Sequence, residues 1–226
     1  MLAPSIVIVD VDAHLDHAEV VRAAGALTRQ CLEHFALAWG VMASVRAASP
    51  NDPPRPTEWR LELRTVPTMQ DALGCHDETD DGIPILYVFP ALCLSDGTTW
   101  TSCASHEILE ALADPYGRRC VQADDGTVWD AEVADRCEAD TYTIDGVTVS
   151  NFNLPACFEP PKNRTGVTYD YMGLSTRPNE VRPGGYAQKL DPAKGWVQIG
   201  TQRSYRAKLA ELKLSRGAKR IMRGRA

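Results

Sequence analysis

The sequence S-C-A-S-H-E-I-L-E-A-L-A occupies residues 102–113, and Asp114-Pro115 follow it directly. Leu109, Leu112 and Ala113 give this stretch an apolar flank, while its acidic residues lie mostly on the side of the histidine. Because a proline disfavours helical backbone in the residue before it, Asp114-Pro115 predicts the end of a helix. We therefore expect an amphipathic helix that packs against a core.

Three polar residues of this helix have the spacing of a metal site. His106, Glu107 and Glu110 stand at positions i, i+1 and i+4. Residues four apart share one helix face, so His106 and Glu110 can reach one ion while Glu107 points alongside it. This is the spacing of the H-E-x-x-H zinc motif, with Glu in place of the second His. In the H-E-x-x-H motif, the two histidines bind Zn²⁺ and the Glu between them is the general base. The alternative is a solvated polar stripe.

A second acidic cluster follows the helix closely enough to supply a third ligand. It contains Glu132, Asp135 and Glu138. Asp114 continues the row of His106 and Glu110, but eight residues along a helix amount to about 12 Å. We therefore interpret Asp114 as a helix-end cap or a partner of a ligand.

Regular elements are predicted on both sides of this helix. A β-branched run predicts a first strand over residues 5–11, and apolar residues at helical spacing predict a helix over 17–39 that Gly40 ends. Asp145-Gly146 predicts the turn of a hairpin over 142–149. Further strands are expected over 41–48, 59–66 and 83–92. Residues 59–66 alternate between apolar and charged side chains, which predicts a half-buried strand. Residues 71–82 are polar and acidic, and residues 151–200 are rich in Pro and Gly and are expected to be irregular.

The composition, 44% hydrophobic and 24% charged residues over 226 positions, excludes collagen-like, coiled-coil and wholly disordered chains. The longest apolar runs are far shorter than the roughly 20 residues of a membrane-spanning helix. Asp10 and Asp12 interrupt the N-terminal apolar stretch, which argues against a secretory signal.

The seven cysteines contain no C-x-x-C pair, so we interpret most of them as small buried side chains in a reducing compartment.

Basic residues are concentrated at the C-terminal end. Residues 203–226 contain nine Lys or Arg and one acid, a net charge of +8, whereas residues 1–202 carry −14. Such a tail can be solvated or can engage an acidic partner surface. Tyr205 is its only aromatic residue, which argues against nucleic-acid binding through stacking. A short basic helix is expected over residues 205–214.

Several runs of the sequence resemble one family. They are S-H-E-I-L-E-A-L-A-D-P (105–115), E-V-A-D-R-C (132–137), V-S-N-F (149–152), F-A-L-A-W-G (35–40), A-L-G-C-H-D (72–77) and P-G-G-Y (183–186). Together they resemble a group of largely uncharacterised bacterial and phage proteins with a zincin-type, metallopeptidase-like core. The resemblance spans roughly residues 30–190.

The resemblance implies an α+β fold of the zincin type: an N-terminal helix, a small mixed sheet and a metal-bearing active-site helix. It implies one domain over residues 1–200, irregular from about 151, and a basic tail over 201–226. By position, His106 and Glu110 would be metal ligands and Glu107 the base. Asp135 is the favoured third ligand, with Glu132 as the alternative.

A site of one His and two carboxylates is harder than the usual peptidase site. We expect it to take Zn²⁺, with Mn²⁺ or Ca²⁺ as competitors. His76 is a candidate for binding substrate or steadying an oxyanion, and otherwise belongs to a surface loop. Tyr186 is a candidate phenol near the metal, and otherwise a packing aromatic residue after a turn.

Two functions are expected from these observations. The first is a metal-dependent hydrolase that acts on peptides or proteins in the cytoplasm. The second is a structural or assembly protein of a phage or prophage particle, in which the zincin-like domain is a scaffold and the basic tail docks on neighbouring subunits. Neither hypothesis involves a membrane or nucleic acid.

Overall fold

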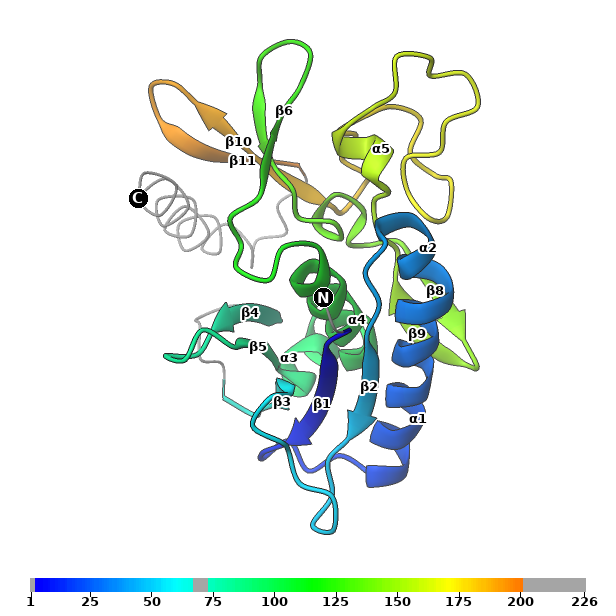
Figure 1. Ribbon diagram of the computed structural model, residues 1–226, viewed down its shortest axis with the longest axis vertical. Helices are drawn as coiled ribbons and strands as arrows, with labels where there is room; N and C mark the ends of the chain where they lie inside the picture. Colours follow the sequence, from blue (N-terminus) through cyan, green and yellow to red (C-terminus); the bar gives the residue numbers. More distant parts are fainter. Residues whose placement is uncertain (1–2, 67–72, 201–226) are drawn as a thin grey trace. The chain divides into compact units, whose positions relative to one another are not determined.

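The computed structural model describes residues 3–66 and 73–200, in a mixed α+β arrangement (Figure 1). The chain divides into two compact units, and we describe each by itself. Unit 1 comprises residues 1–115 and 141–150, and unit 2 comprises residues 116–140 and 151–226. The helix expected over 205–214 and the basic tail lie outside the described residues.

Unit 1 is built on a five-stranded sheet in the order β2-β1-β3-β5-β4. Strands β2, β1, β3 and β5 run parallel, and β4 pairs antiparallel with β5 at one edge. The apolar runs of the sequence supply its buried side chains, including Ile6, Ile8, Leu61, Leu63 and Leu86. The strands are β1 (Ser5–Asp10), β2 (Ser44–Ala47), β3 (Trp59–Leu63), β4 (Gly74–Glu78) and β5 (Pro84–Val88).

The long helical segment after β1 confirms the prediction for residues 17–39. It consists of α1 (His17–Arg29), a π-helical segment η1 (Gln30–Phe35) and α2 (Ala36–Trp39). Gly40 ends it with a φ of 68°, a left-handed conformation that costs glycine little. The π-helical turn was not predicted, because the spacing of apolar residues hardly changes over so short a segment.

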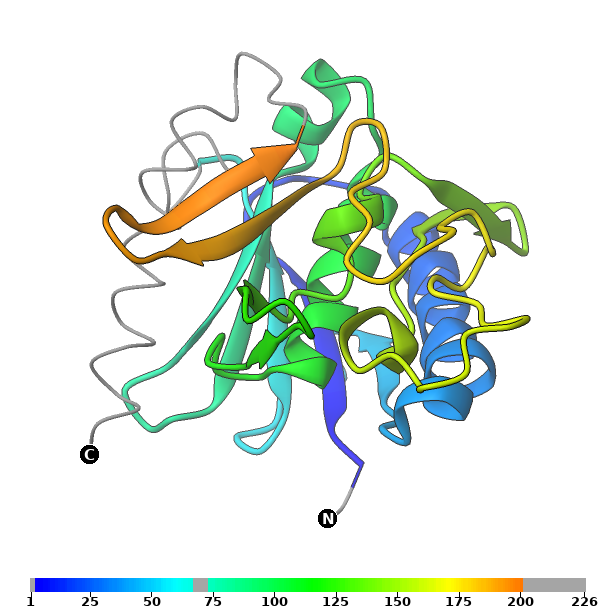
Figure 2. The same cartoon turned by 90° about the horizontal axis from the view of Figure 1, so that it is seen from above.

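The helix that carries the H-E-x-x-E sequence is α4 (Trp100–Ala113), two residues longer than predicted at its N-terminal end. The hydroxyl of Thr99 caps it by accepting a hydrogen bond from the backbone N–H of Ser102. In unit 1, α4 packs on β4, β5 and β9 (Val147–Ser150). Figure 2 shows it (green) beside α1 (blue).

A buried polar network fixes how α4 lies in unit 1. Ser105 Oγ donates to Gln30 Oε1 at 2.7 Å and accepts from the backbone N–H of Ser150 at 3.0 Å. Gln30 Nε2 donates in turn to the Ser150 carbonyl at 2.9 Å. Buried polar groups that are all hydrogen-bonded hold a unique packing, so this network defines the orientation of the helix one residue before His106.

Ser150 ends the predicted hairpin, which consists of β8 (Thr141–Ile144) and β9 (Val147–Ser150). Asp145 and Gly146 form its turn with φ values of 51° and 77°. Two positive φ values in sequence are typical of a type I′ turn, so this prediction is confirmed.

Three segments differ from expectation. The acidic stretch 71–82 contains strand β4, because pairing with β5 decides its conformation. The strand expected over 83–92 ends at Val88, where Pro90 opens the short helix α3 (Pro90–Ser95). Strand β3 ends at Leu63 rather than at residue 66, and on its polar side Arg60 is exposed as predicted, whereas Glu62 is buried next to Arg64.

Unit 2 contains a four-stranded sheet in the order β11-β10-β7-β6. Its hairpin of β10 and β11 was not predicted within the Pro- and Gly-rich stretch 151–200. The elements of the unit are β6 (Cys120–Gln122), β7 (Val128–Asp130), the 3₁₀ turn η2 (Asp135–Cys137), α5 (Pro155–Phe158), β10 (Tyr186–Asp191) and β11 (Gly195–Gly200).

Arg136 is completely buried in unit 2. Its guanidinium lies 3.1 Å from a carboxylate oxygen of Asp130, donates to the Asp130 carbonyl at 2.9 Å and lies over the Phe158 ring at 4.9 Å. A β-carbon at Gly185 would lie 2.3 Å from the Arg136 carbonyl oxygen, so only glycine fits there. The E-V-A-D-R-C and P-G-G-Y runs therefore pack against each other.

None of the seven cysteines, all of which lie in the described residues, forms a disulfide, and five of them are buried. Burial raises the pKa of the Cys31 thiol to about 12, which makes the reactive thiolate scarce at neutral pH. This agrees with the interpretation of most cysteines as packing residues.

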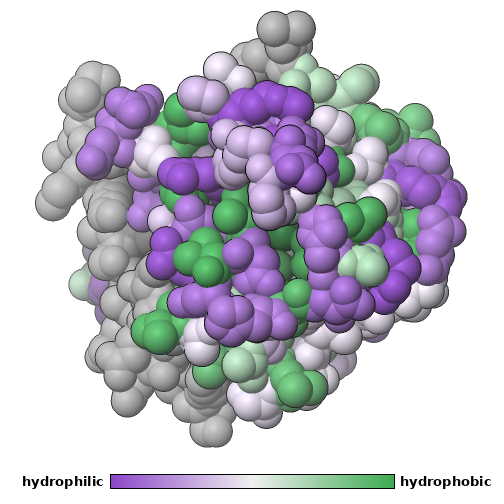
Figure 3. All heavy atoms as spheres, turned by 90° about the horizontal axis from the view of Figure 1, so that it is seen from below, coloured by the Kyte–Doolittle hydropathy of each residue, from purple (hydrophilic) through white to green (hydrophobic). Residues whose placement is uncertain are grey.

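Over residues 3–66 and 73–200, no helix combines the length and the apolar character needed to cross a membrane. Figure 3 shows one face of the molecule, on which hydrophobic residues are scattered among hydrophilic ones.

Glu58 links the first strands of unit 1 and permits a test of the fold. Its carboxylate accepts two hydrogen bonds from Arg46, at 2.8 and 2.6 Å, one from Ser5 and one from the backbone N–H of Arg55. The hydrogen bonds with Arg46, more than any other contact, lower the pKa of Glu58 from 4.5 to about 2.

We expect Glu58→Gln to lower the free energy of unfolding by about 1.5–3 kcal/mol at pH 7, the range for hydrogen bonds to charged groups. Because the folded-state pKa is depressed, this contribution is complete above the ordinary pKa and is lost as the pH falls towards the folded value. Urea unfolding at pH 7, 5 and 3 should show the wild-type advantage shrinking. An undiminished advantage at pH 3 would contradict the assignment.

Candidate metal centre

The polar residues predicted on α4 lie inside the protein. His106, Glu107 and Glu110 are 8%, 7% and 3% exposed. The alternative of a solvated polar stripe is therefore wrong. Burying a carboxylate is costly unless cations or hydrogen bonds compensate its charge, so Glu107 and Glu110 require such partners inside the protein.

His106 and Glu110 share one face of α4, as their spacing predicts. His106 Nε2 lies 3.1 Å from Glu110 Oε1. Donor atoms bound to one zinc ion at 2.0–2.2 Å lie about 3.3–3.6 Å apart in tetrahedral geometry. The pair is thus close to the separation that two ligands of one ion require.

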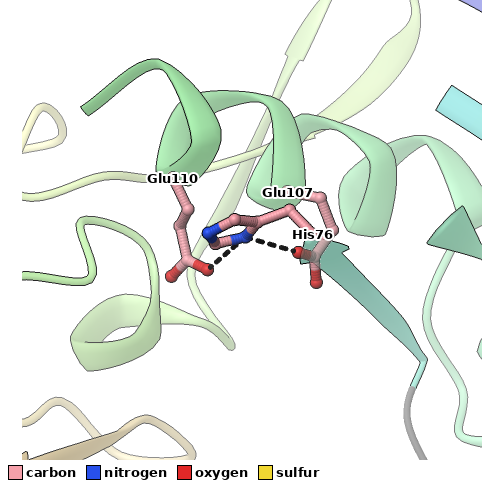
Figure 4. A group of neighbouring side chains, drawn as sticks. All are labelled: His76, Glu107 and Glu110. Carbon is pink, nitrogen blue, oxygen red and sulfur yellow. Dashed lines mark hydrogen bonds and ion pairs between the residues drawn. The ribbon is translucent and has the colours of Figure 1, made fainter. Parts of the chain in front are cut away.

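His76 joins this cluster from the neighbouring strand β4. Its Nδ1 lies 3.3 Å from Glu107 Oε2 and 4.0 Å from Glu110 Oε2. Figure 4 shows its ring directed from the strand towards the two carboxylates of the helix. One donor atom from each of His76, Glu107 and Glu110 lies within 4.8 Å of the others, so these buried residues could hold a metal ion.

Gly74 makes room for Glu107 beside β4. A β-carbon at this position would lie 2.9 Å from both Cγ and Oε1 of Glu107 and 3.0 Å from the Tyr87 carbonyl oxygen. Real β-carbons do not approach other atoms so closely. The A-L-G-C-H-D run therefore provides two features of the cluster, the space for Glu107 and the imidazole of His76.

The remaining candidates are Asp114 at the end of α4 and three residues of unit 2. Asp114 is the C-terminal cap residue of α4, and its backbone N–H donates to the Glu110 carbonyl at 2.7 Å, which agrees with the helix-end interpretation. Asp135, Glu132 and Tyr186 are buried residues of unit 2; Asp135 opens η2 and Tyr186 opens β10. The third-ligand role of Asp135 or Glu132, and the role of Tyr186, stay predictions.

Sequence reasoning treated His76 as a substrate-binding or surface residue and did not place it among potential ligands. The available signal was its position in the A-L-G-C-H-D run. Comparison with known proteins adds no further assignment: no family model matches the chain, and no curated protein or solved structure matches it significantly.

Proposed function

We propose that this protein is a metal-dependent hydrolase that cleaves peptide bonds. The observation that carries the proposal is the buried group on α4, in which His106 and Glu110 lie 3.1 Å apart with Glu107 beside them. His106 and Glu110 would hold the metal, and Glu107 would be the general base.

The arrangement of unit 1 supports a zincin-like fold. The N-terminal helix α1 follows β1, the first strand of a mixed sheet that has a single antiparallel edge strand, β4. The helix with the H-E-x-x-E sequence packs on that edge strand and its neighbour. This is the layout that the resemblance implies.

The residues of the cluster have separable roles in this proposal. His106 and Glu110 would hold a divalent cation, which would supply Lewis acidity towards the substrate carbonyl and lower the pKa of water. Glu107 accepts the proton of the attacking water and delivers it to the leaving nitrogen. Because a general base must be ionised and an ionised carboxylate only accepts hydrogen bonds, His76 Nδ1 would donate to Glu107 Oε2 and orient it.

The donor set favours zinc. Imidazole nitrogen suits zinc and other late transition metals, whereas carboxylate oxygen also suits Mn²⁺ and Ca²⁺. We therefore propose Zn²⁺ as the resident ion and Mn²⁺ as its closest competitor.

Metal content and cleavage of fluorescein-labelled casein test this proposal together. We expect the purified full-length chain to retain zinc and to hydrolyse casein, and His106→Ala to lose the zinc ion that His106 holds together with the activity. His17→Gln, which changes an exposed histidine at the start of α1, is the matched control and should retain both.

Elemental mass spectrometry gives the metal content, and released fluorescence gives the rate. A wild-type protein that binds no Zn²⁺ or Mn²⁺ after dialysis against either ion contradicts the proposal. So does casein cleavage that is undiminished in His106→Ala.

A further inference from the structure

We infer that His76, Glu107 and Glu110 form a second, inhibitory cation site, which shares Glu110 with the site of the proposed function. The location of this site rests on the geometry of unit 1. Its inhibitory effect also rests on the proposed role of Glu107 as the base.

Glu110 is placed to bridge two ions. Its Oε1 lies 3.1 Å from Nε2 of His106, whereas its Oε2 lies 4.0 Å from Nδ1 of His76. The two carboxylate oxygens thus face two different imidazoles. A carboxylate with one oxygen directed to each of two nitrogen ligands is a natural bridge between neighbouring metal ions.

The spacing around His76 also fits the ligands of one cation. The 3.3 Å contact with Glu107 is long for a hydrogen bond, and the 4.0 Å contact with Glu110 is outside the range. Around a tetrahedral zinc ion with ligand bonds of 2.0–2.2 Å, any two donor atoms lie about 3.3–3.6 Å apart. Around a six-coordinate ion with the same bond lengths, adjacent donors lie about 3 Å apart and opposite donors about 4 Å apart. Small side-chain rotations would therefore bring all three donors onto one ion.

The donor atoms define the class of ion. One imidazole nitrogen and two carboxylate oxygens favour Zn²⁺, Co²⁺ or Mn²⁺ over Mg²⁺ and Ca²⁺, which prefer all-oxygen sites. An ion already held by His106 and Glu110 repels a second one and withdraws charge from the shared carboxylate. The second site should therefore bind more weakly than the first.

Occupancy of the second site would stop hydrolysis. Glu107 acts as a base only while its oxygen is available to accept a proton from water. When both His76 and Glu107 ligate an ion, that oxygen is engaged and the hydrogen bond that orients it is lost. Activity should rise as zinc fills the first site and fall as zinc fills the second.

The decisive variant is His76→Asn. An asparagine amide nitrogen lies near the position of Nδ1 and can still donate to Glu107, but a neutral amide is a poor zinc ligand. His17→Gln is the control for removal of an exposed histidine. Thermal unfolding of each variant verifies the fold, and His76→Ala provides a second substitution at the same position.

Equilibrium dialysis of the metal-free full-length chain against increasing Zn²⁺, with elemental mass spectrometry, measures the sites directly. We expect His76→Asn and His76→Ala to bind one zinc ion fewer per chain than wild type and His17→Gln. In the casein assay, wild type should pass through a maximum with rising zinc, and His76→Asn should reach a plateau without the decline.

Equal zinc stoichiometry in wild type and His76→Asn would overturn the second site, whatever the activity. A decline at high zinc that persists in His76→Asn would overturn its inhibitory role. If His76→Asn loses one ion but no protein cleaves casein, the cation site stands while the proposed hydrolase falls. The two proposals can therefore fail separately.

Discussion

Glu107→Gln is expected to lower the rate of casein hydrolysis by about 10²–10⁴-fold, the range that general acid–base catalysis contributes. The amide has nearly the shape of the carboxylate, and its oxygen can still accept the hydrogen bond from His76. It cannot accept a proton from water, so the chemical step should slow while the cluster keeps its packing. Initial rates at saturating casein measure the effect.

Two controls separate loss of the base from loss of the site. Glu107→Gln should retain the zinc ion that His106→Ala loses, as measured by elemental mass spectrometry. Glu33→Gln removes an exposed carboxylate that pairs with Arg29 and should leave the rate unchanged. A rate for Glu107→Gln within twofold of wild type would rule out Glu107 as the base.

Arg136→Met should have the largest effect on stability, about 3–5 kcal/mol, which is the usual cost of removing one partner of a buried ion pair. The substitution leaves the completely buried carboxylate of Asp130 without its cation and removes the donor to two backbone carbonyls. Hydrogen exchange of residues 116–140 and 151–200, measured by mass spectrometry, should show faster opening throughout unit 2.

The double variant Asp130→Asn with Arg136→Met distinguishes an unpaired charge from lost packing. If the buried charge is the main cost, the double variant should be more stable than Arg136→Met alone. Asn keeps an oxygen that can accept from the backbone N–H of Gln188, as Asp130 does. Protection of unit 2 in Arg136→Met equal to that of wild type would contradict the proposed importance of the pair.

Elements defined by local signals could be predicted from the sequence. Helix α4 has an apolar flank and a proline after its end, and the hairpin of β8 and β9 has an Asp-Gly turn. Strand β4 has neither alternation nor β-branched residues, and it exists because its backbone pairs with β5. The hairpin of β10 and β11 likewise depends on pairing rather than on composition.

The same distinction between local signals and long-range pairing applies to the candidate site. The separation of His106 and Glu110 follows from helical geometry alone, so their proximity was predictable. His76 is 31 residues from Glu107 in sequence, and only the register of β4 and the packing of α4 bring them together. The burial of Arg136 could not be foreseen either. Arginine is rarely buried unless it is paired, and the sequence alone does not identify its partner.

Because Gly74 approaches Glu107 so closely, the residue types that positions 74 and 107 can accept depend on each other. A larger residue on the edge strand would displace the carboxylate, so position 74 becomes free to vary only after position 107 has lost its long acidic side chain. Loss of the proposed base would lift the part of this restriction that comes from Glu107 and leave the part that comes from the Tyr87 carbonyl oxygen. Paired replacement of the glycine and the glutamate would then mark lineages in which this fold has been retained for another purpose.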